Sequence, residues 1–378
     1  MDSSPAMPSL ARAEAEPGAA QRPLVLWVTA VSNVAGVGRH FLDTARAGGV
    51  PGHRMVYALP EGPLAVALRE TGAAVVTGRF GAREQSAVTA VLSLRSLLRR
   101  LRPAIVHTHL PYADVIGCAA RRGLRAPDGG SIRLVSTEHC ISADPDLLQP
   151  SHARALVMAR VHHVRLRLTD HLIGVAEYTR REVRRQWSRT VPMTVIRNGV
   201  DRMHVPRDRA TGLRVLSMAR LAHEKRIGDV IAVFAALVAR EESARLTIAG
   251  EGTERSELER LVAQLGLDGT VRFAGFIDKE QAFREHDVMV QLSAVENLSY
   301  SLLEAVAHGI GVIATDVGGN DEILPAHCIV DVADREAAAS AIIDQGLNRD
   351  RRPVLDGTIP TVAEMLERVA GVYREVLA

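Results

Sequence analysis

The chain has 378 residues, a length at which a single hydrophobic core usually gives way to two domains. Hydrophobic residues make up 47% of it and charged residues 24%, which is typical of a globular protein and excludes a fibrous or fully disordered one. A formal net charge of +2 without a polybasic block argues against nucleic-acid binding, and three separated cysteines fit neither a disulfide framework nor a cysteine zinc site.

The N-terminal stretch 1–22 is rich in Ala, Pro, Ser and Glu and has no continuous apolar run. This composition predicts a disordered tail and not a signal peptide. No later stretch approaches the roughly 18 apolar residues of a membrane-spanning helix. Together with the cysteine pattern, these features predict a cytoplasmic protein.

Short apolar runs alternate with helical patterns through the first half of the chain. Strands are expected at 24–31, 53–59, 73–78, 104–109, 133–139, 171–176 and 193–199. Helices are expected from about His40 and at 62–72, 84–102, 111–122, 151–168 and 177–187. Strands that are apolar almost throughout and alternate with helices predict a parallel sheet covered on both faces.

The stretch 204–212 interrupts this alternation and is expected to connect two domains, 23–205 and 206–360. A second series follows, with strands at 213–219, 244–250, 271–276, 287–293 and 311–316, and helices at 226–240, 253–265, 279–285, 301–308 and 361–377. The sequence therefore predicts two doubly wound α/β halves. Ligands of such folds bind at the carboxyl ends of the strands, so the loops that leave the strands are the candidates for chemistry.

Glycines occur in two of these loops. In "AGVGRH", Gly36 and Gly38 could let the backbone approach a phosphate, but a dinucleotide fingerprint is disfavoured because Phe41 stands where its third glycine would be. In "AGEGTERSEL", Gly250 and Gly252 could serve a phosphate or simply a tight turn.

Two basic residues follow the first strand of the second half. Arg220 and Lys225 in "SMARLAHEKR" lie five positions apart, close to the start of a helix. A guanidinium and an ammonium group that converge there could hold a diphosphate. The alternative is a pair of ordinary solvated cations.

Three histidines end strands of the first half. The spacing of His107 and His109 suggests a metal site, but the sequence offers no obvious third ligand. We interpret His107 as a hydrogen-bonded core residue. His109 and His139 are expected to bind a polar ligand, and no metal is predicted.

Two glutamates stand eight positions apart in "SAVENLSYSLLEAVAHGIG". Glu304 follows Ser301 by three residues, so it could close a capping box at a helix start. Glu296 lies in a loop before that helix, where no such structural role is available. Gly318 and Gly319 follow the next strand and could close over the same site.

Taken in order, these segments resemble retaining glycosyltransferases of family 4, the group 1 type. The E-x7-E pair, "MARLAHEK", "AGEGTER", "AGVGRH", "IVHTHLPYADVIG", "VSTEH" and "VIRNGVD" carry the resemblance over about residues 24–378. It implies the GT-B fold, in which two Rossmann-like domains face a cleft. The N-terminal domain would bind the acceptor, the C-terminal domain the nucleotide sugar, and the final helix, 361–378, would return to the N-terminal domain.

The resemblance also implies roles for individual residues. Arg220 and Lys225 would grip the donor diphosphate, Glu304 would bind the ribose, and Glu296 would position the sugar. Further donor contacts would come from Gly36, Gly250, Gly252, Phe276 and Ile277 around the diphosphate and nucleobase, and from Asn297, Leu298 and Ser299 beside the sugar. His139 and His109 would face the sugar, with Gly36 also admitting the acceptor. Of these, Arg220, Lys225, Glu296 and His139 would be the catalytic residues.

The activity implied is metal-independent transfer with retention, without a cofactor, from a nucleotide sugar to a hydroxyl of a small molecule or lipid carrier. A UDP-sugar is favoured over a GDP-sugar. The sequence departs from the family pattern in two places. Asn297 and Ser299, after Glu296, occupy positions where glycine is common, and Arg226, after Lys225, occupies another. Alternatives are a sugar-nucleotide epimerase of the same fold and a catalytically inactive protein that serves only as a binding subunit.

The basic, amphipathic stretch 94–103 suggests weak peripheral contact with the inner face of a membrane. The alternative is a surface helix covered by arginine, which we favour. No pattern in the sequence predicts an oligomeric state.

Overall fold

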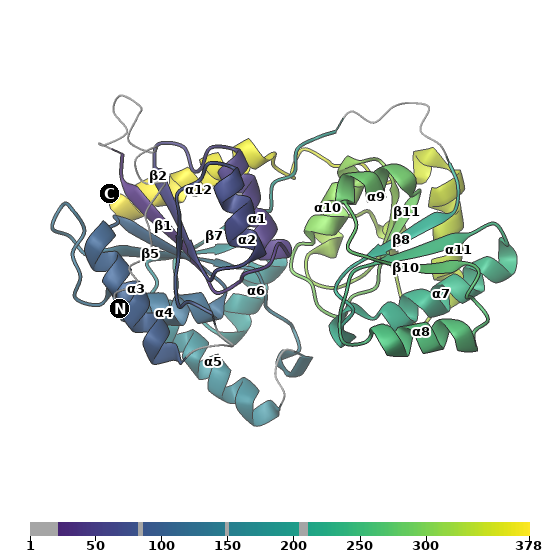
Figure 1. The fold of residues 1–378 in the computed structure, drawn as a ribbon, viewed down its shortest axis with the longest axis horizontal. Coiled ribbons are helices and arrows are strands. Elements are labelled where there is room, and N and C mark those ends of the chain that lie inside the picture. The colour runs from purple at the N-terminus through teal and green to yellow at the C-terminus, as the bar shows by residue number, and fades with distance from the viewer. Residues whose placement is uncertain (1–21, 82–85, 148–150, 204–210) are drawn as a thin grey trace, which may run out of the picture. The chain divides into compact units, whose positions relative to one another are not determined.

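The computed structural model describes residues 22–81, 86–147, 151–203 and 211–378 (Figure 1). The chain divides into two compact units. Unit 1 comprises Met1–Gly199 and Val362–Ala378, and unit 2 comprises Val200–Thr361. Nearly all of the expected tail 1–22, and residues 204–210 of the expected connection, lie outside the described residues.

Unit 1 is built on a seven-stranded sheet in the order β3-β2-β1-β4-β5-β6-β7. Every neighbouring pair of strands is parallel, as the sequence predicts. The strands are β1 (Leu24–Thr29), β2 (Arg54–Leu59), β3 (Val75–Thr77), β4 (Ile105–His109), β5 (Arg133–Glu138), β6 (His171–Gly174) and β7 (Met193–Val195).

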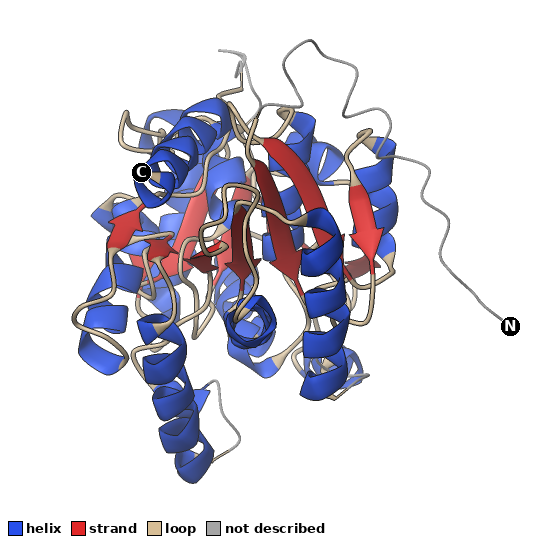
Figure 2. Cartoon of the chain, turned by 90° about the vertical axis from the view of Figure 1, so that its left-hand side faces the viewer, coloured by secondary structure: helices blue, strands red, loops and turns tan. Residues whose placement is uncertain are grey.

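Helices cover both faces of this sheet (Figure 2). Alternate residues of β1 enter different cores: Val25 and Trp27 pack with α1, α2 and α12, whereas Leu26 and Val28 pack with α3 and α4. The helices are α1 (Gly36–Arg46), α2 (Pro63–Glu70), α3 (Ala87–Leu101), α4 (Pro111–Arg121), α5 (His152–Arg167), α6 (Glu177–Gln186) and α12 (Val362–Leu377).

Helix α1 begins at Gly36, earlier than the expected start near His40. Glycine has a low helix propensity, and two glycines in one turn hide that turn from a pattern of apolar residues. As a result, Gly36 and Gly38 belong to the first turn of a helix and not to a free loop.

Unit 2 has a six-stranded parallel sheet in the order β10-β9-β8-β11-β12-β13. Its strands are β8 (Arg214–Met218), β9 (Arg245–Ala249), β10 (Val271–Gly275), β11 (Val288–Gln291), β12 (Gly311–Thr315) and β13 (Ile329–Val330). Its helices are α7 (Ile227–Arg240), α8 (Arg255–Gln264), α9 (Lys279–Glu285), α10 (Tyr300–Ala307) and α11 (Arg335–Leu347). The sequence did not predict β13 or α11.

The stretch 94–103 belongs mainly to α3, and its apolar face is already used. Leu94, Leu97 and Leu98 are buried in the core of unit 1. Arg95 donates hydrogen bonds to the carbonyls of Ala120 and Arg122 at the end of α4. These leucines are therefore not available to enter a lipid surface. Among the described residues, no helix is long and apolar enough to cross a membrane.

A buried chain of hydrogen bonds ties the last helix to the sheet of unit 1. Trp27 Nε1 on β1 donates to the hydroxyl of Tyr373 on α12 over 2.7 Å. The same hydroxyl lies 2.6 Å from Nδ1 of His107 on β4, and His107 Nε2 lies 2.7 Å from the hydroxyl of Thr137 on β5. Both ring nitrogens of His107 are thus satisfied, which confirms its interpretation as a hydrogen-bonded core histidine.

We predict that Tyr373→Phe destabilises unit 1 by about 1–3 kcal/mol, because it leaves two buried polar groups without a partner. Urea unfolding followed by tryptophan fluorescence would measure this, since both tryptophans, Trp27 and Trp187, lie in unit 1. Tyr57→Phe is the matched control: Tyr57 is equally buried, but its hydroxyl has no hydrogen-bond partner among the described residues. Equal effects of the two substitutions would contradict the prediction.

Candidate functional site

The expected donor residues of unit 2 follow the carboxyl ends of neighbouring strands. Arg220 lies two residues after β8, and Lys225 ends a short 3₁₀ turn that precedes α7. Glu296 lies in the loop between β11 and α10, whereas Glu304 lies within α10. The parallel sheet therefore places all four near one edge of unit 2.

Backbone hydrogen bonds join the loops at this edge. Leu221 N donates to Glu251 O over 3.0 Å, which links the loops after β8 and β9. Ala294 N donates to Glu224 O over 2.8 Å and links the loops after β8 and β11. Gly319 N, after β12, donates to Asn297 O over 2.7 Å. Four loops that are distant in sequence thus form one connected surface.

Glycine is required where these loops touch. A Cβ atom at Gly252 would overlap the carbonyl of Leu221, and one at Gly318 would overlap the carbonyl of Glu296. Gly250 has a φ of +139° and would collide with the carbonyl of Ala219. The glycines after β9 and β12 therefore serve the close approach of neighbouring loops, whether or not they also approach a phosphate.

Each expected charged residue of this surface is paired with an opposite charge. Lys225 forms an ion pair with Glu296, and Arg220 forms one with Glu224. The Lys225 and Glu296 side chains are 21% and 14% exposed, whereas the Arg220 side chain is 64% exposed. The Arg220 side chain is thus largely solvated and contacts one carboxylate, whereas the Lys225 ion pair is mostly buried.

Glu304 has a partner that the sequence analysis missed. Lys279, the first residue of α9, donates to Glu304 Oε1 over 2.5 Å, and the Glu304 side chain is only 8% exposed. The two residues come from different helices, so no local pattern connects them. The only sequence signal was a lysine at the start of a helix that follows a strand end.

The helix that carries Glu304 is capped by Ser299, not by Ser301. Ser299 Oγ accepts a hydrogen bond from Leu302 N and donates one to Gln291 Oε1 over 3.0 Å. The capping-box interpretation of Ser301 and Glu304 is therefore wrong. Ser299, at a position where the family often has glycine, is used to cap a helix and anchor it to β11. Asn297 and Leu298 beside it are buried.

Phe276 is the most exposed large hydrophobic side chain among the described residues, at 89% exposure. It follows β10 directly, and Gly275 before it accepts a hydrogen bond from Gly250 N over 2.7 Å. Ile277 beside it is half-buried. An exposed aromatic ring is therefore attached to the same connected edge of unit 2.

In unit 1, the two glycines of "AGVGRH" differ in their surroundings. A Cβ atom at Gly38 would overlap the carbonyl of Asn33, so this position is restricted by its own fold. A Cβ atom at Gly36 would meet nothing within 4 Å. Gly36 is therefore free of any packing requirement within unit 1.

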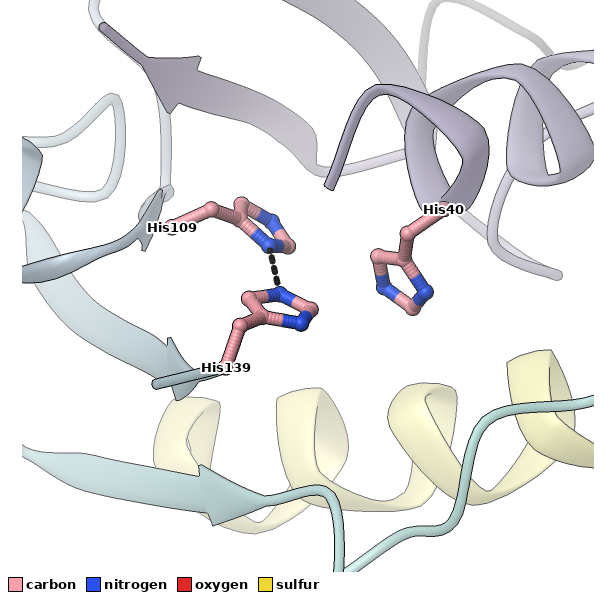
Figure 3. A group of neighbouring side chains, drawn as sticks. All are labelled: His40, His109 and His139. Atoms are coloured by element: carbon pink, nitrogen blue, oxygen red, sulfur yellow. Dashed lines mark hydrogen bonds between the residues drawn. The ribbon is translucent and has the colours of Figure 1, made fainter. Parts of the chain in front are cut away.

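His109 and His139 come together at the carboxyl ends of β4 and β5. Nδ1 of His109 lies 3.0 Å from Nε2 of His139, and His40 of α1 lies beside both (Figure 3). Burial lowers the pKa of His40 to about 4 and places the pKa values of His109 and His139 well below the ordinary value. The three rings are therefore neutral near pH 7. The sequence analysis did not single out His40.

A buried ion cluster fixes the backbone next to His139. Arg165 of α5 donates to Glu138 Oε2 over 2.5 Å and forms an ion pair with Asp114 of α4. Glu138 also accepts a hydrogen bond from Cys140 N, so it is held on both sides of His139. Burial raises the pKa of Glu138 to about 7, although Arg165 acts in the opposite direction.

The expected site residues thus form two sets, one in each unit. Arg220, Lys225, Glu296 and Glu304 lie with the glycine turns and Phe276 on unit 2, and His109 and His139 lie together on unit 1 with Gly36 at the start of α1. The residues of each set therefore belong to one unit only.

Two family models match the chain. The one described as "Glycosyltransferase Family 4" matches residues 34–203, and the one described as "Glycosyl transferases group 1" matches residues 204–353. Among curated proteins, the glycogen synthase of Mycobacterium tuberculosis is 28% identical over 281 residues, covering 72% of this chain and 64% of its own length. One component of the human phosphatidylinositol N-acetylglucosaminyltransferase is 26% identical over 249 residues, covering 63% of this chain and 48% of its own length. The matches therefore span less than two thirds of these relatives.

Solved structures share the fold over nearly the whole chain. Anabaena HepE, in complex with UDP and glucose, has a TM-score of 0.74 at 18% identity and covers 93% of this chain and 99% of its own. Sucrose-phosphate synthase from Thermosynechococcus elongatus has a TM-score of 0.72 at 19% identity and covers 94% and 99%. Two parallel-sheet units, these neighbours and the two family models together identify a GT-B glycosyltransferase of group 1, whose N-terminal domain matches the family 4 model.

Proposed function

We propose that the protein is a retaining, metal-independent glycosyltransferase. It would move a sugar from a nucleotide sugar to a hydroxyl of a small molecule or a lipid-linked acceptor. The observation that carries this proposal is the connected edge of unit 2, where backbone hydrogen bonds bring Arg220, Lys225 and Glu296 onto one surface. Family membership supplies the donor class, and this surface supplies groups suited to it.

The two cations fit the diphosphate of such a donor. Arg220 is 64% exposed and its partner Glu224 belongs to the same loop, so its guanidinium group can turn to a phosphate without unfolding anything. Lys225 would follow by leaving Glu296. Fixed cations at the phosphate stabilise the negative charge that develops as the bond to the sugar breaks. Once Lys225 contacts the phosphate, the Glu296 carboxylate would be left to position the sugar.

The nucleoside would lie between Glu304 and Phe276. Glu304 can accept hydrogen bonds from the two ribose hydroxyls, with Lys279 holding its carboxylate in place. The exposed ring of Phe276 can cover the nucleobase. Anabaena HepE and the pneumococcal O-GlcNAc transferase GtfA, with TM-scores of 0.74 and 0.58, were solved with UDP, which supports a uridine donor here.

The sugar and the acceptor would contact unit 1. His139 is partly exposed and neutral near pH 7, so it can exchange hydrogen bonds with sugar hydroxyls without adding charge. His109 is fully buried and would act through its contact with His139. Gly36 offers open backbone at the start of α1. The names of three relatives refer to glycogen, phosphatidylinositol and L-malate. We therefore propose the acceptor only as a class, a molecule that offers a hydroxyl group.

The proposed reaction needs no protein nucleophile. The bond between the anomeric carbon and the leaving phosphate oxygen breaks, and the bond to the acceptor oxygen forms on the same face. The acceptor proton passes to the departing phosphate. Arg220 and Lys225 would supply the charge that a metal ion supplies in other transferases, and Glu296 would hold the sugar during the exchange.

We expect Arg220→Ala and Lys225→Ala each to weaken UDP binding by about 10- to 150-fold. A charge-assisted hydrogen bond to phosphate contributes about 1.5–3 kcal/mol, which corresponds to that range. Isothermal titration calorimetry with UDP measures the effect.

Arg240→Ala is the matched control for this titration. Arg240, the last residue of α7, is also an exposed arginine of unit 2, but its guanidinium group donates a hydrogen bond to Ser340 of α11. Its removal is expected to leave UDP affinity unchanged. Wild-type affinity in both Arg220→Ala and Lys225→Ala would contradict the proposed diphosphate site.

We expect sugar transfer to continue at an undiminished rate in excess EDTA, because protein cations carry the phosphate charge. The measurement is release of UDP from a UDP-sugar in the presence and absence of the chelator. A rate that falls in EDTA and returns with added Mg²⁺ or Mn²⁺ would show that transfer depends on a metal.

We expect Gly36→Ala to fold normally but to transfer sugar about 10- to 100-fold more slowly. The new Cβ atom meets nothing within unit 1, so any loss reports contact with a substrate, and small misplacements of reactants have effects of this size. Gly371→Ala on α12, where the nearest atom is 3.8 Å away, is the control. Normal turnover by Gly36→Ala would remove Gly36 from the site.

A further inference from the structure

Three histidines from separate elements of unit 1 surround a common point (Figure 3). His40 comes from α1, His109 ends β4, and His139 directly follows β5. We propose that these three side chains form a binding site for a divalent transition-metal ion of the zinc type. The ion would be held by three imidazoles, with a further coordination position left for an outside ligand.

The spacing of the three rings fits one ion. Their centroids lie 5.4 Å (His40 and His109), 5.2 Å (His40 and His139) and 5.3 Å (His109 and His139) apart. Zinc binds histidine nitrogen at about 2.0–2.1 Å, so imidazoles on a tetrahedral ion have centroids roughly 5.2 Å apart. The three rings therefore already form a triangle of the required size.

The ligand atoms need only a small adjustment. One ring nitrogen from each histidine lies within 4.8 Å of the others, and His109 and His139 already approach to 3.0 Å. Nitrogens on a tetrahedral zinc ion are about 3.3 Å apart. Closing the set therefore requires movements of about 1.5 Å or less at the ring atoms, which side-chain rotations can supply.

Burial favours ligation over protonation. His40 is 4% exposed and His109 is fully buried, with His40 stacked on Trp27 at 5.3 Å and His109 packed against Phe41 at 4.7 Å. The lowered pKa values keep the three rings in the neutral form near pH 7, which is the form that binds a metal. The aromatic neighbours restrict the rings, so little side-chain freedom remains to be lost on binding.

The second ring nitrogen distinguishes His109 from His107. Nε2 of His109 is buried and has no hydrogen-bond partner in the part of the chain that the structure describes. If Nδ1, the atom that faces His139, binds the ion, Nε2 carries the ring proton. His107, the fourth histidine nearby, is different because both of its nitrogens are held by Tyr373 and Thr137.

The ligand set selects the kind of ion. It contains three imidazoles and no carboxylate, which suits zinc, cobalt, nickel or copper and disfavours magnesium or calcium. The ion has no step in the proposed transfer. It would occupy the histidines that are proposed to face the sugar, so metal and sugar would compete; this consequence rests on the proposed function, whereas metal binding does not.

The test is a titration of the chelator-treated full-length protein with Co²⁺, followed by visible absorption, which reports tetrahedral coordination. We expect one Co²⁺ per chain, displaced by one equivalent of Zn²⁺. His40→Gln and His139→Gln should each weaken binding at least about 100-fold, since loss of even an outer-shell partner weakens metal sites 10- to 100-fold.

His107→Gln is the neighbouring control, because its ring lies 4.4 Å from that of His109 but outside the ligand set. His163→Gln, a partly exposed histidine bonded to Trp187 O, is a second control if His107→Gln unfolds. Absence of the tetrahedral spectrum in the wild-type protein, or affinity within a few-fold of wild type in either His40→Gln or His139→Gln, would overturn the site. UDP calorimetry on the same samples tests the proposed transferase separately.

Discussion

The candidate donor site depends on backbone hydrogen bonds between loops that leave neighbouring strands of unit 2. A parallel sheet fixes where each strand ends, but it does not fix the loops that follow. The N–H groups of Leu221, Ala294 and Gly319 each donate to a carbonyl on another loop, and glycine stands where the backbones touch. The main chain therefore positions these loops, and ion pairs then hold the side chains that the loops carry. With the loops fixed in this way, binding of a phosphate would require only side-chain rotations.

The same loops keep their charges compensated in pairs. Lys225 holds Glu296, Arg220 holds Glu224, and Lys279 holds Glu304, so no half-buried charge of this set stands alone. Exposed pairs of this kind contribute only about 0–1 kcal/mol, whereas a charge-assisted bond to phosphate contributes about 1.5–3 kcal/mol. A diphosphate can therefore displace the carboxylate of Arg220 at little cost. The more buried Lys225 pair would resist exchange more strongly, so in the proposed mechanism Glu296 is released only when the donor arrives.

The order of strands and helices was largely predictable, because apolar runs and helical patterns are local properties of the sequence. Two elements were missed or shortened for local reasons. Strand β13 has only two residues, and the glycines of α1 concealed the first turn of that helix. The site residues divide in the same way. Arg220, Glu296 and His139 could be found because each follows a strand end. Lys279 and His40 could not, since their neighbours lie far along the chain. Ser299 and not Ser301 is the cap because α10 begins at Tyr300, directly after Ser299.

The two units solve different electrostatic problems. Unit 2 presents full charges in pairs, which suits a phosphate group whose charge rises during reaction. Unit 1 presents imidazoles that burial keeps neutral, backed by an ion cluster in which Arg165 joins Glu138 and Asp114. Neutral donors and acceptors suit hydroxyl groups, because they bind without a large desolvation penalty. The same neutrality suits the three histidines to metal ligation, so the surface proposed to face the sugar has the chemistry to bind a transition-metal ion as well.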